Sequence, residues 1–186
     1  MAAWRGLLEE LLRDRRSALI GYATLLTGDR AEAEDLVHDA ILRTFGRPRT
    51  FPSLNAADAY VRRAIASAYI DRARSRGSWL GAMRRLAAEE AANEATPDDD
   101  AAGRLDVRAA LRTLPRRQRT CVVLRFYDDL RVADIAAALG LSDGAVKRYL
   151  SDGIRHLNAA LGTTADPRAV DAPTVDVQLT GRRAGR

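Results

Sequence analysis

The sequence predicts an all-α protein made of two small helical domains joined by a flexible linker. Apolar residues recur at helical spacing along most of the chain, and no stretch has the pattern of a β-sheet. Hydrophobic residues make up 47% of the sequence but aromatic residues only 5%, which suits helices packed closely through Ala and Leu. A length of 186 residues is enough for two small domains, each with its own apolar core.

The first domain is expected in residues 1–76 and begins with two amphipathic helices. One helix is predicted over residues 7 to about 26, where the turn-forming sequence TGDR ends it. The next is predicted from about residue 31 to 45. In this second helix Val37, Ile41 and Phe45 are spaced four apart and form a buried stripe.

A loop and a third helix complete the first domain. The loop is GRPRTFPSL, residues 46–54, whose two prolines prevent either neighbouring helix from continuing through it. We expect Asn55 to cap the third helix, with Asp58 as the acid of a capping box. The helical pattern persists to about Arg76, and Asp71 can pair with Arg74 along one face.

An acidic linker is predicted over residues 77–105, where AAEEAANEATPDDDAAG offers little apolar surface to bury. The second domain is expected in residues 106–161. It starts with a short helix, and Pro115 suits the first turn of the next helix, whose core face includes Val122, Val123 and Phe126. Residues 162–186 mix Pro, Gly and polar residues and predict a disordered tail.

The end of the second domain has the pattern of a helix-turn-helix unit. In LRVADIAAALGLSDGAVKRYLSDGIRHL, residues 130–157, Gly140 can end the first helix and Ser142 can cap the second. Ala136 is small enough to let the helices cross closely. The second helix is expected to point four residues inward: Val146, Leu150, Ile154 and Leu157. Five residues are expected to point outward: Asp143, Lys147, Arg148, Ser151 and Arg155.

A helix with this cationic face fits the major groove of DNA, where Lys and Arg bind guanine and phosphate acceptors. The alternative is an ordinary helical hairpin with a solvated face. The preceding helix adds Arg116, Arg117, Arg119 and Arg125 as phosphate contacts, of which Arg125 is preferred.

Composition sets further limits on function. The net charge of +5 and the isoelectric point of about 10.0 favour a polyanionic partner. A single cysteine, Cys121, and an amino terminus without a signal peptide or membrane span favour the cytoplasm. The two histidines, His38 and His156, lie in different domains, so we expect no catalytic residues, no metal site and no cofactor.

Three stretches of the chain closely resemble the two conserved regions of bacterial sigma-70 factors, in their short extracytoplasmic-function (ECF) group. They are GDRAEAEDLVHDAILRTF, DAYVRRAIASAYIDRARSR and LRTLPRRQRTCVVLRFYDDLRVADIAAALGLSDGAVKRYLSDGIRHL. The resemblance implies a sigma factor that binds the RNA polymerase core through its β′ clamp and β flap. It also implies promoter DNA and an anti-sigma factor as partners, without membrane insertion.

The resemblance assigns roles to residues in both regions. Region 2 would bind the polymerase through Asp35, His38, Asp39 and Leu42. It would melt and bind the minus-ten element through Arg47, Arg49, Tyr60, Arg62, Arg63, Ser67 and Arg74. Tyr69 is expected in the core. Region 4 would bind the minus-thirty-five element through Arg125, Ser142, Gly144, Lys147, Arg148, Ser151 and Arg155.

Three positions depart from the family pattern, which usually has Asn at Ser67, often Trp at Tyr60, and Gln at His38. The acidic linker matches in position and charge the family segment that passes toward the polymerase cleft, or it is a solvated spacer.

Two other functional classes remain as alternatives. One is a stand-alone helix-turn-helix regulator, although no receiver or ligand domain is visible. The other is a DNA recombinase, although no carboxylate or nucleophile cluster has suggestive spacing.

Overall fold

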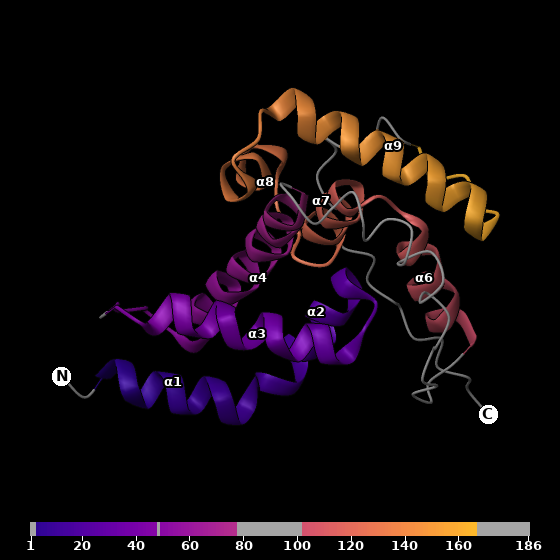
Figure 1. The fold of residues 1–186 in the computed structure, drawn as a ribbon. Coiled ribbons are helices and arrows are strands. Elements are labelled where there is room, and N and C mark those ends of the chain that lie inside the picture. Colours follow the sequence, from indigo (N-terminus) through magenta and orange to yellow (C-terminus); the bar gives the residue numbers. More distant parts are fainter. Residues whose placement is uncertain (1–2, 48, 78–101, 167–186) are drawn as a thin grey trace, which may run out of the picture.

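The computed structural model describes residues 3–47, 49–77 and 102–166, and these residues form helices and no strands (Figure 1). The all-α prediction is therefore confirmed. In the first half the helices are α1 (Ala3–Asp14), α2 (Arg16–Thr27), α3 (Arg30–Phe45) and α4 (Leu54–Gly77). In the second half they are α6 (Ala102–Thr113), α7 (Arg116–Phe126), α8 (Val132–Leu139) and α9 (Asp143–Leu161).

The first helix of the prediction is two helices in the structure. The chain turns at Arg15, whose φ of −120° departs from helical geometry, and this turn separates α1 from α2. As a result α1 packs beside α4 while α2 packs against α3. The Arg15 side chain donates a hydrogen bond to Asn55 Oδ1 at 3.1 Å, which ties the turn to the start of α4. Apolar spacing alone did not reveal this turn.

The predicted boundaries of α3 are nearly correct, but the predicted cap of α4 is wrong. Asp29 caps α3 by accepting a hydrogen bond from the Glu32 backbone N–H at 2.7 Å. At α4 the Ser53 hydroxyl accepts from the Ala56 N–H at 3.2 Å, so Ser53 and not Asn55 is the cap. Asp58 is buried and pairs with a side chain one turn further along α4, so it is not a capping acid.

The helix-turn-helix prediction is confirmed for its hinge and its core. Gly140 ends α8 in the left-handed region with a φ of 62°, which a glycine adopts without strain. The Ser142 hydroxyl caps α9 by accepting from the Ala145 N–H at 3.3 Å. The small side chain of Ala136 is buried, and so are those of Val146, Leu150 and Ile154. The predicted inward residue Leu157 is only partly buried.

Other expectations about the second half need correction. Helix α6 begins at Ala102, so the end of the range predicted as linker is helical. Phe126 is 64% exposed and does not face the core. At the start of the predicted tail, the Asn158 amide donates to the Ala165 carbonyl at 2.7 Å, so the chain is hydrogen-bonded there. Residues 78–101 and 167–186, which hold most of the predicted linker and tail, lie outside the described residues.

The two halves pack directly against each other. Helix α4 contacts α7 and α8, and α2 contacts α6 and α7. The buried apolar side chains of both halves form a single connected core. In Figure 1 α4 rises from the lower group of helices and meets α7 and α8 in the upper group. The two predicted domains are therefore in contact, which the prediction of a flexible connection did not include.

Candidate DNA-binding and polymerase-binding surfaces

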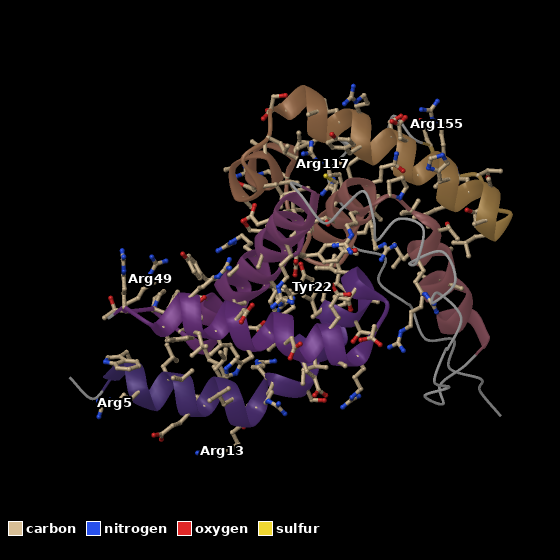
Figure 2. The ribbon with its side chains drawn as sticks, viewed as in Figure 1. Arg5, Arg13, Tyr22, Arg49, Arg117 and Arg155 are labelled. Atoms are coloured by element: carbon tan, nitrogen blue, oxygen red, sulfur yellow. The ribbon has the colours of Figure 1, made fainter. Side chains whose placement is uncertain are left out.

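The solvent face of α9 presents most of the predicted region 4 contacts. Lys147, Arg148 and Arg155 are exposed, and Arg155 also pairs with Asp152, three residues before it on the preceding turn. Ser142 and Gly144 are exposed in the first turn, and Ser151 is half-buried. A Cβ atom at Gly144 would meet no atom within 4 Å, so a large ligand has room to approach the backbone there. In Figure 2 Arg155 lies on α9, and Arg117 lies beneath α9, on the side of α7.

Two further residues join this face and were not predicted as a pair. Arg117 in the first turn of α7 donates a hydrogen bond to the Tyr149 hydroxyl on α9 at 3.0 Å. The Tyr149 ring also lies 5.9 Å from the Arg117 guanidinium and 5.4 Å from that of Arg148. The hydrogen bond from Arg117 is the largest cause that lowers the pKa of Tyr149. The Tyr149 ring is therefore near two cations beside the exposed face of α9.

Arg125 does not lie on this surface, contrary to the prediction. The residue is 8% exposed, and its Nη1 atom donates to Asp129 Oδ1 and to the Leu130 carbonyl, each at 3.4 Å. The helical pattern of α7 placed Arg125 among four arginines, but it could not distinguish the arginine that stabilises the following turn. We therefore exclude Arg125 from the DNA-binding surface.

Aromatic and cationic side chains gather where the loop before α4 meets its first turns. The ring of Phe51 lies 5.7 Å from that of Phe45 and 5.4 Å from that of Tyr60. The guanidinium of the exposed Arg49 lies over the Tyr60 ring, 4.5 Å from its centroid. Phe51 was missed as a site residue. Its only sequence signal was an aromatic residue between the two prolines of the loop.

The remaining predicted minus-ten residues lie in several environments. Arg47 is exposed, and Arg63 and Ser67 are half-buried on α4. Tyr69 is 2% exposed, so its predicted place in the core is confirmed. The Arg74 side chain lies outside the described residues, although α4 passes through this position.

Arg62 is engaged with two carboxylates. It is paired with Asp58 on α4, and its Nη1 atom donates to Asp128 Oδ1 at 2.9 Å. Asp128 follows α7 in the second half of the chain, so this ion pair joins the two predicted domains. Burial is the largest effect on Asp128 and raises the pKa of its carboxyl group despite the neighbouring guanidinium.

The predicted polymerase contacts lie on α3. Asp35, His38 and Leu42 are exposed, and the Leu42 side chain is 57% exposed despite being apolar. These residues follow one another at three- and four-residue steps and share a face. Asp39 differs from them, since its carboxylate is paired with Arg72 of α4. The surface therefore combines an unpartnered leucine with polar neighbours, as protein interfaces often do.

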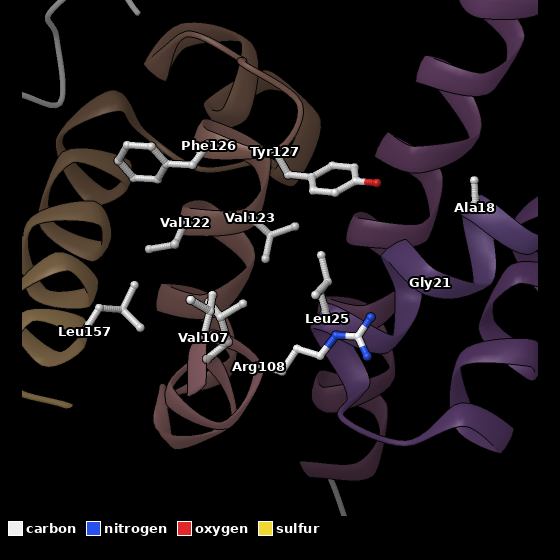
Figure 3. Close-up of a pocket in the computed structure, with 11 residues that line it drawn as sticks. Ala18, Gly21, Leu25, Val107, Arg108, Val122, Val123, Phe126, Tyr127 and Leu157 are labelled. Carbon is white, nitrogen blue, oxygen red and sulfur yellow. The ribbon is translucent and has the colours of Figure 1, made fainter. Parts of the chain in front are cut away.

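An apolar groove of about 680 Å³ opens between the two halves (Figure 3). Leu25 of α2 lines one side, and Val122, Val123 and Phe126 of α7 line the other. The exposed ring of Phe126 belongs to this groove, which accounts for its departure from the predicted core.

The described residues offer little for chemistry. Within them, His, Cys, Asp and Glu side chains form no group of three or more that could bind a metal ion. Cys121 is fully buried, and burial raises the pKa of its thiol to about 12, so it is a poor nucleophile at neutral pH. In the described part of the chain, no helix combines the length and the hydropathy needed to span a membrane.

Comparison with known proteins identifies both halves. The family profile "Sigma-70 region 2" matches residues 11–78, and "Sigma-70, region 4" matches residues 104–157. The RNA polymerase sigma-E factor of Streptomyces coelicolor is 36% identical over 171 residues, which are 88% of this chain and 91% of that protein. The ECF RNA polymerase sigma factor SigL of Mycobacterium tuberculosis is 30% identical over 165 residues, 86% of this chain and 92% of that protein.

A solved structure supports the fold. The sigma factor RpoE in complex with the anti-sigma factor NepR from Bartonella quintana has a TM-score of 0.63 to this chain. The structural alignment covers 89% of this chain and 100% of the RpoE chain, with 21% sequence identity. Since both halves and most of the length match sigma factors, the alternative of a stand-alone regulator is not supported. The chain belongs to the sigma-70 family, as an RNA polymerase sigma factor of the ECF group with regions 2 and 4.

Proposed function

We propose that this sigma factor binds the RNA polymerase core through the exposed face of α3 and contacts the promoter through two separate surfaces. The observation that carries the proposal is the pairing of an exposed cationic α9 in a helix-turn-helix with an aromatic and cationic loop before α4. The same chain thus has one surface suited to duplex DNA and another suited to unpaired bases. Residues 1–76 and 106–161 would act as the two functional domains.

Region 4 would insert α9 into the major groove at the minus-thirty-five element. Lys147 and Arg148 are exposed and long enough to bind guanine acceptors, while the exposed Arg155 would bind phosphate. Ser142, Gly144 and Ser151 would line the approach to the major groove of the DNA. Arg117 would add a phosphate contact, because its hydrogen bond to the Tyr149 hydroxyl holds its guanidinium near α9, where the Tyr149 ring also lies near Arg148.

Region 2 would hold the melted minus-ten strand. Unpaired bases stack on aromatic rings, each for about 1–3 kcal/mol, and the Phe51–Tyr60 pair next to Arg49 combines such rings with a cation. Arg47, Arg63 and Ser67 extend the surface toward α4. Arg62 also belongs to it, but its guanidinium must leave Asp128 before it can bind DNA.

The polymerase surface would be centred on Leu42, with Asp35 and His38 beside it. A half-exposed leucine loses water contact when a partner covers it, which favours binding.

The factor itself would catalyse no reaction. It would act with the polymerase in the cytoplasm. An anti-sigma protein is proposed as a further partner, since the similar RpoE structure contains the anti-sigma factor NepR.

Replacement of Arg148 by Ala tests the proposed readout by region 4. Loss of a base contact should weaken binding to the cognate minus-thirty-five element by about 1–3 kcal/mol. Binding to random duplex DNA should weaken less. Arg13→Ala on α1 removes an exposed arginine of the same charge on another part of the molecule and serves as the control. An equal loss on cognate and random DNA would contradict base readout by Arg148.

A further inference from the structure

The apolar groove between α2 and the helices α6, α7 and α9 has no role in the proposed DNA and polymerase contacts. Of the five large apolar side chains that the described part of the chain exposes, three line this groove: Val107, Phe126 and Tyr127, which are 45%, 64% and 52% exposed. In Figure 3 Leu157 and Phe126 lie on the α9 side of the groove and Leu25 on the α2 side. Exposed apolar side chains gathered in this way mark an interaction site.

The chain after α9 turns back and is fixed beside this groove. Gly162 ends α9 in the left-handed region with a φ of 65°. The Asn158 side chain then accepts a hydrogen bond from the Ala165 N–H at 3.1 Å and donates one to the Ala165 carbonyl at 2.7 Å. Asn158 directly follows Leu157, which lines the groove. Residues 167–186 therefore continue from an anchor next to the groove wall.

The sequence beyond this anchor contains a short apolar segment that can reach the groove. In residues 174–179, TVDVQL, which we name the docking segment, Val175, Val177 and Leu179 alternate with polar residues. Such alternation places the three apolar side chains on one face of an extended chain. The nine residues from Asp166 to Val175 can span up to about 30 Å. Axes of packed helices lie only about 8–10 Å apart, so the docking segment can reach either wall.

Charge also favours the docking segment as the occupant. Among the described residues that line the groove, Arg108 alone is charged, and it is exposed. The docking segment contains Asp176, and Asp171 lies three residues before it. A guanidinium at the edge of an apolar groove attracts acidic groups that flank apolar side chains. The groove and the docking segment are therefore complementary in charge as well as in polarity.

We propose that the docking segment of this chain binds in the apolar groove. Its three apolar side chains pack against Phe126 and Leu157, and Asp176 lies near Arg108. Because the segment is tethered at Ala165, its effective concentration at the groove is on the order of mM, so a few apolar contacts are enough to hold it. Another protein could then enter the groove only after the docking segment leaves.

Photo-crosslinking of the full chain tests which segment occupies the groove. The photoreactive residue p-benzoylphenylalanine replaces Phe126, whose ring is already exposed, so the fold should tolerate it. Irradiation followed by mass spectrometry should show crosslinks to residues 174–179. The control places the same residue at Leu12, an exposed leucine of α1 that does not line the groove, and should show no crosslink to these residues.

A mixture of unlabelled and nitrogen-15-labelled chains separates crosslinks within one chain from crosslinks between two chains. Crosslinks within one chain to the docking segment support the proposal. Crosslinks that join two chains, crosslinks from position 126 only to other parts of the chain, or the same yield from position 12 would each overturn it. Absence of any crosslink from position 126 would also overturn it, since nothing would then cover this ring.

A binding measurement tests the apolar contacts separately. A fluorescein-labelled peptide of residues 170–180 is titrated with the wild-type full chain and with the full chain that carries Val175→Ser, Val177→Ser and Leu179→Ser. The peptide should bind the triple variant at least about tenfold more tightly, because in the wild-type chain the tethered segment competes for the groove. The peptide with the same three serines is the control and should not bind. Equal affinity of the peptide for both chains, or equal binding of the control peptide, would overturn the proposal.

Discussion

Arg117 of α7 and Tyr149 of α9 are joined by a hydrogen bond of 3.0 Å, which links the helix before the helix-turn-helix to its second helix. The tyrosine ring is shared with Arg148, so its position affects two cations at once. The bond lies at the edge of the exposed face of α9. Its effect on DNA binding can be separated from its effect on folding, because all three side chains are at least partly exposed.

Arg117→Ala should weaken binding to duplex DNA at all sequences and reduce the slope of log affinity against log salt by about 1, as expected for one lost phosphate contact. Tyr149→Phe keeps the ring but removes the acceptor for Arg117, so it should weaken binding by a smaller factor. Fluorescence anisotropy over a salt series provides the measurement. The same loss in the Arg13→Ala control would show that net charge, and not this cluster, is responsible.

Leu42→Ala should weaken binding to the polymerase core by about 1–2 kcal/mol, because a central apolar contact of the α3 surface would be lost. Leu12→Ala is a matched control, since Leu12 on α1 is also a leucine with 39% exposure. Isothermal titration calorimetry with sigma-free core measures both variants. A similar loss for both leucines would place the interface elsewhere.

Asp35→Arg should also disrupt polymerase binding, since it reverses an exposed charge on the same face. The domain should stay folded, because an exposed side chain contributes little to the core. Co-purification with the core polymerase tests binding, and thermal unfolding tests the fold. Retained co-purification would remove Asp35 from the interface.

Gly153→Ala should destabilise the protein by about 1–3 kcal/mol through overpacking between α7 and α9. A Cβ atom at Gly153 would lie 2.8 Å from Val122 Cγ2, and a β-branched valine moves aside poorly. Gly144→Ala on the same helix meets no atom within 4 Å, so it should leave stability unchanged or raise it by up to about 1 kcal/mol. Urea unfolding of the pair measures the difference. Equal midpoints would contradict the tight crossing.

Cys121 should make the folded state less stable at alkaline pH. The pKa of its thiol is raised by burial from 9.0 to about 12, so the unfolded chain loses the proton first as pH rises. The stabilising contribution is fully present below pH 9.0 and is lost progressively toward pH 12. The free energy of unfolding should therefore fall more steeply with rising pH from 9.0 toward about 12 than in Cys121→Ala.

The same burial predicts that Cys121 reacts with a thiol reagent only after unfolding. The alanine variant corrects the pH series for other groups that titrate there, including Tyr22 and Tyr69, whose pKa values are also raised. Rapid labelling of native protein at pH 8 would contradict the buried, protonated thiol.

The sequence predicted the helix-turn-helix well because local signals agree there. Gly140 needs a left-handed conformation, Ser142 is a capping residue, and Val146, Leu150 and Ile154 repeat at four-residue spacing. Each signal acts within a few residues, so no distant contact could override it. The exposed positions of Lys147 and Arg148 followed from the same helical spacing.

Contacts between distant residues could not be predicted in this way. Periodicity marked Arg62, Arg119 and Arg125 as polar positions on helices, but it did not show that Asp128, the Leu26 carbonyl or the turn after α7 would bind them. The Ser53 cap was missed because Asn55 offered an equally good local signal. The packing of region 4 on region 2 depends on surfaces that are far apart in the sequence.

Transcription in vitro is the most direct test of whether this chain directs promoter-specific initiation. The purified full chain is mixed with sigma-free core polymerase from the same organism and a fragmented library of its genome, and the transcripts are sequenced. Specific start sites that share two spaced upstream elements are expected, and Arg148→Ala should reduce their use. Specific binding to duplex DNA by the chain alone, with no polymerase binding and no specific start sites, would contradict this role.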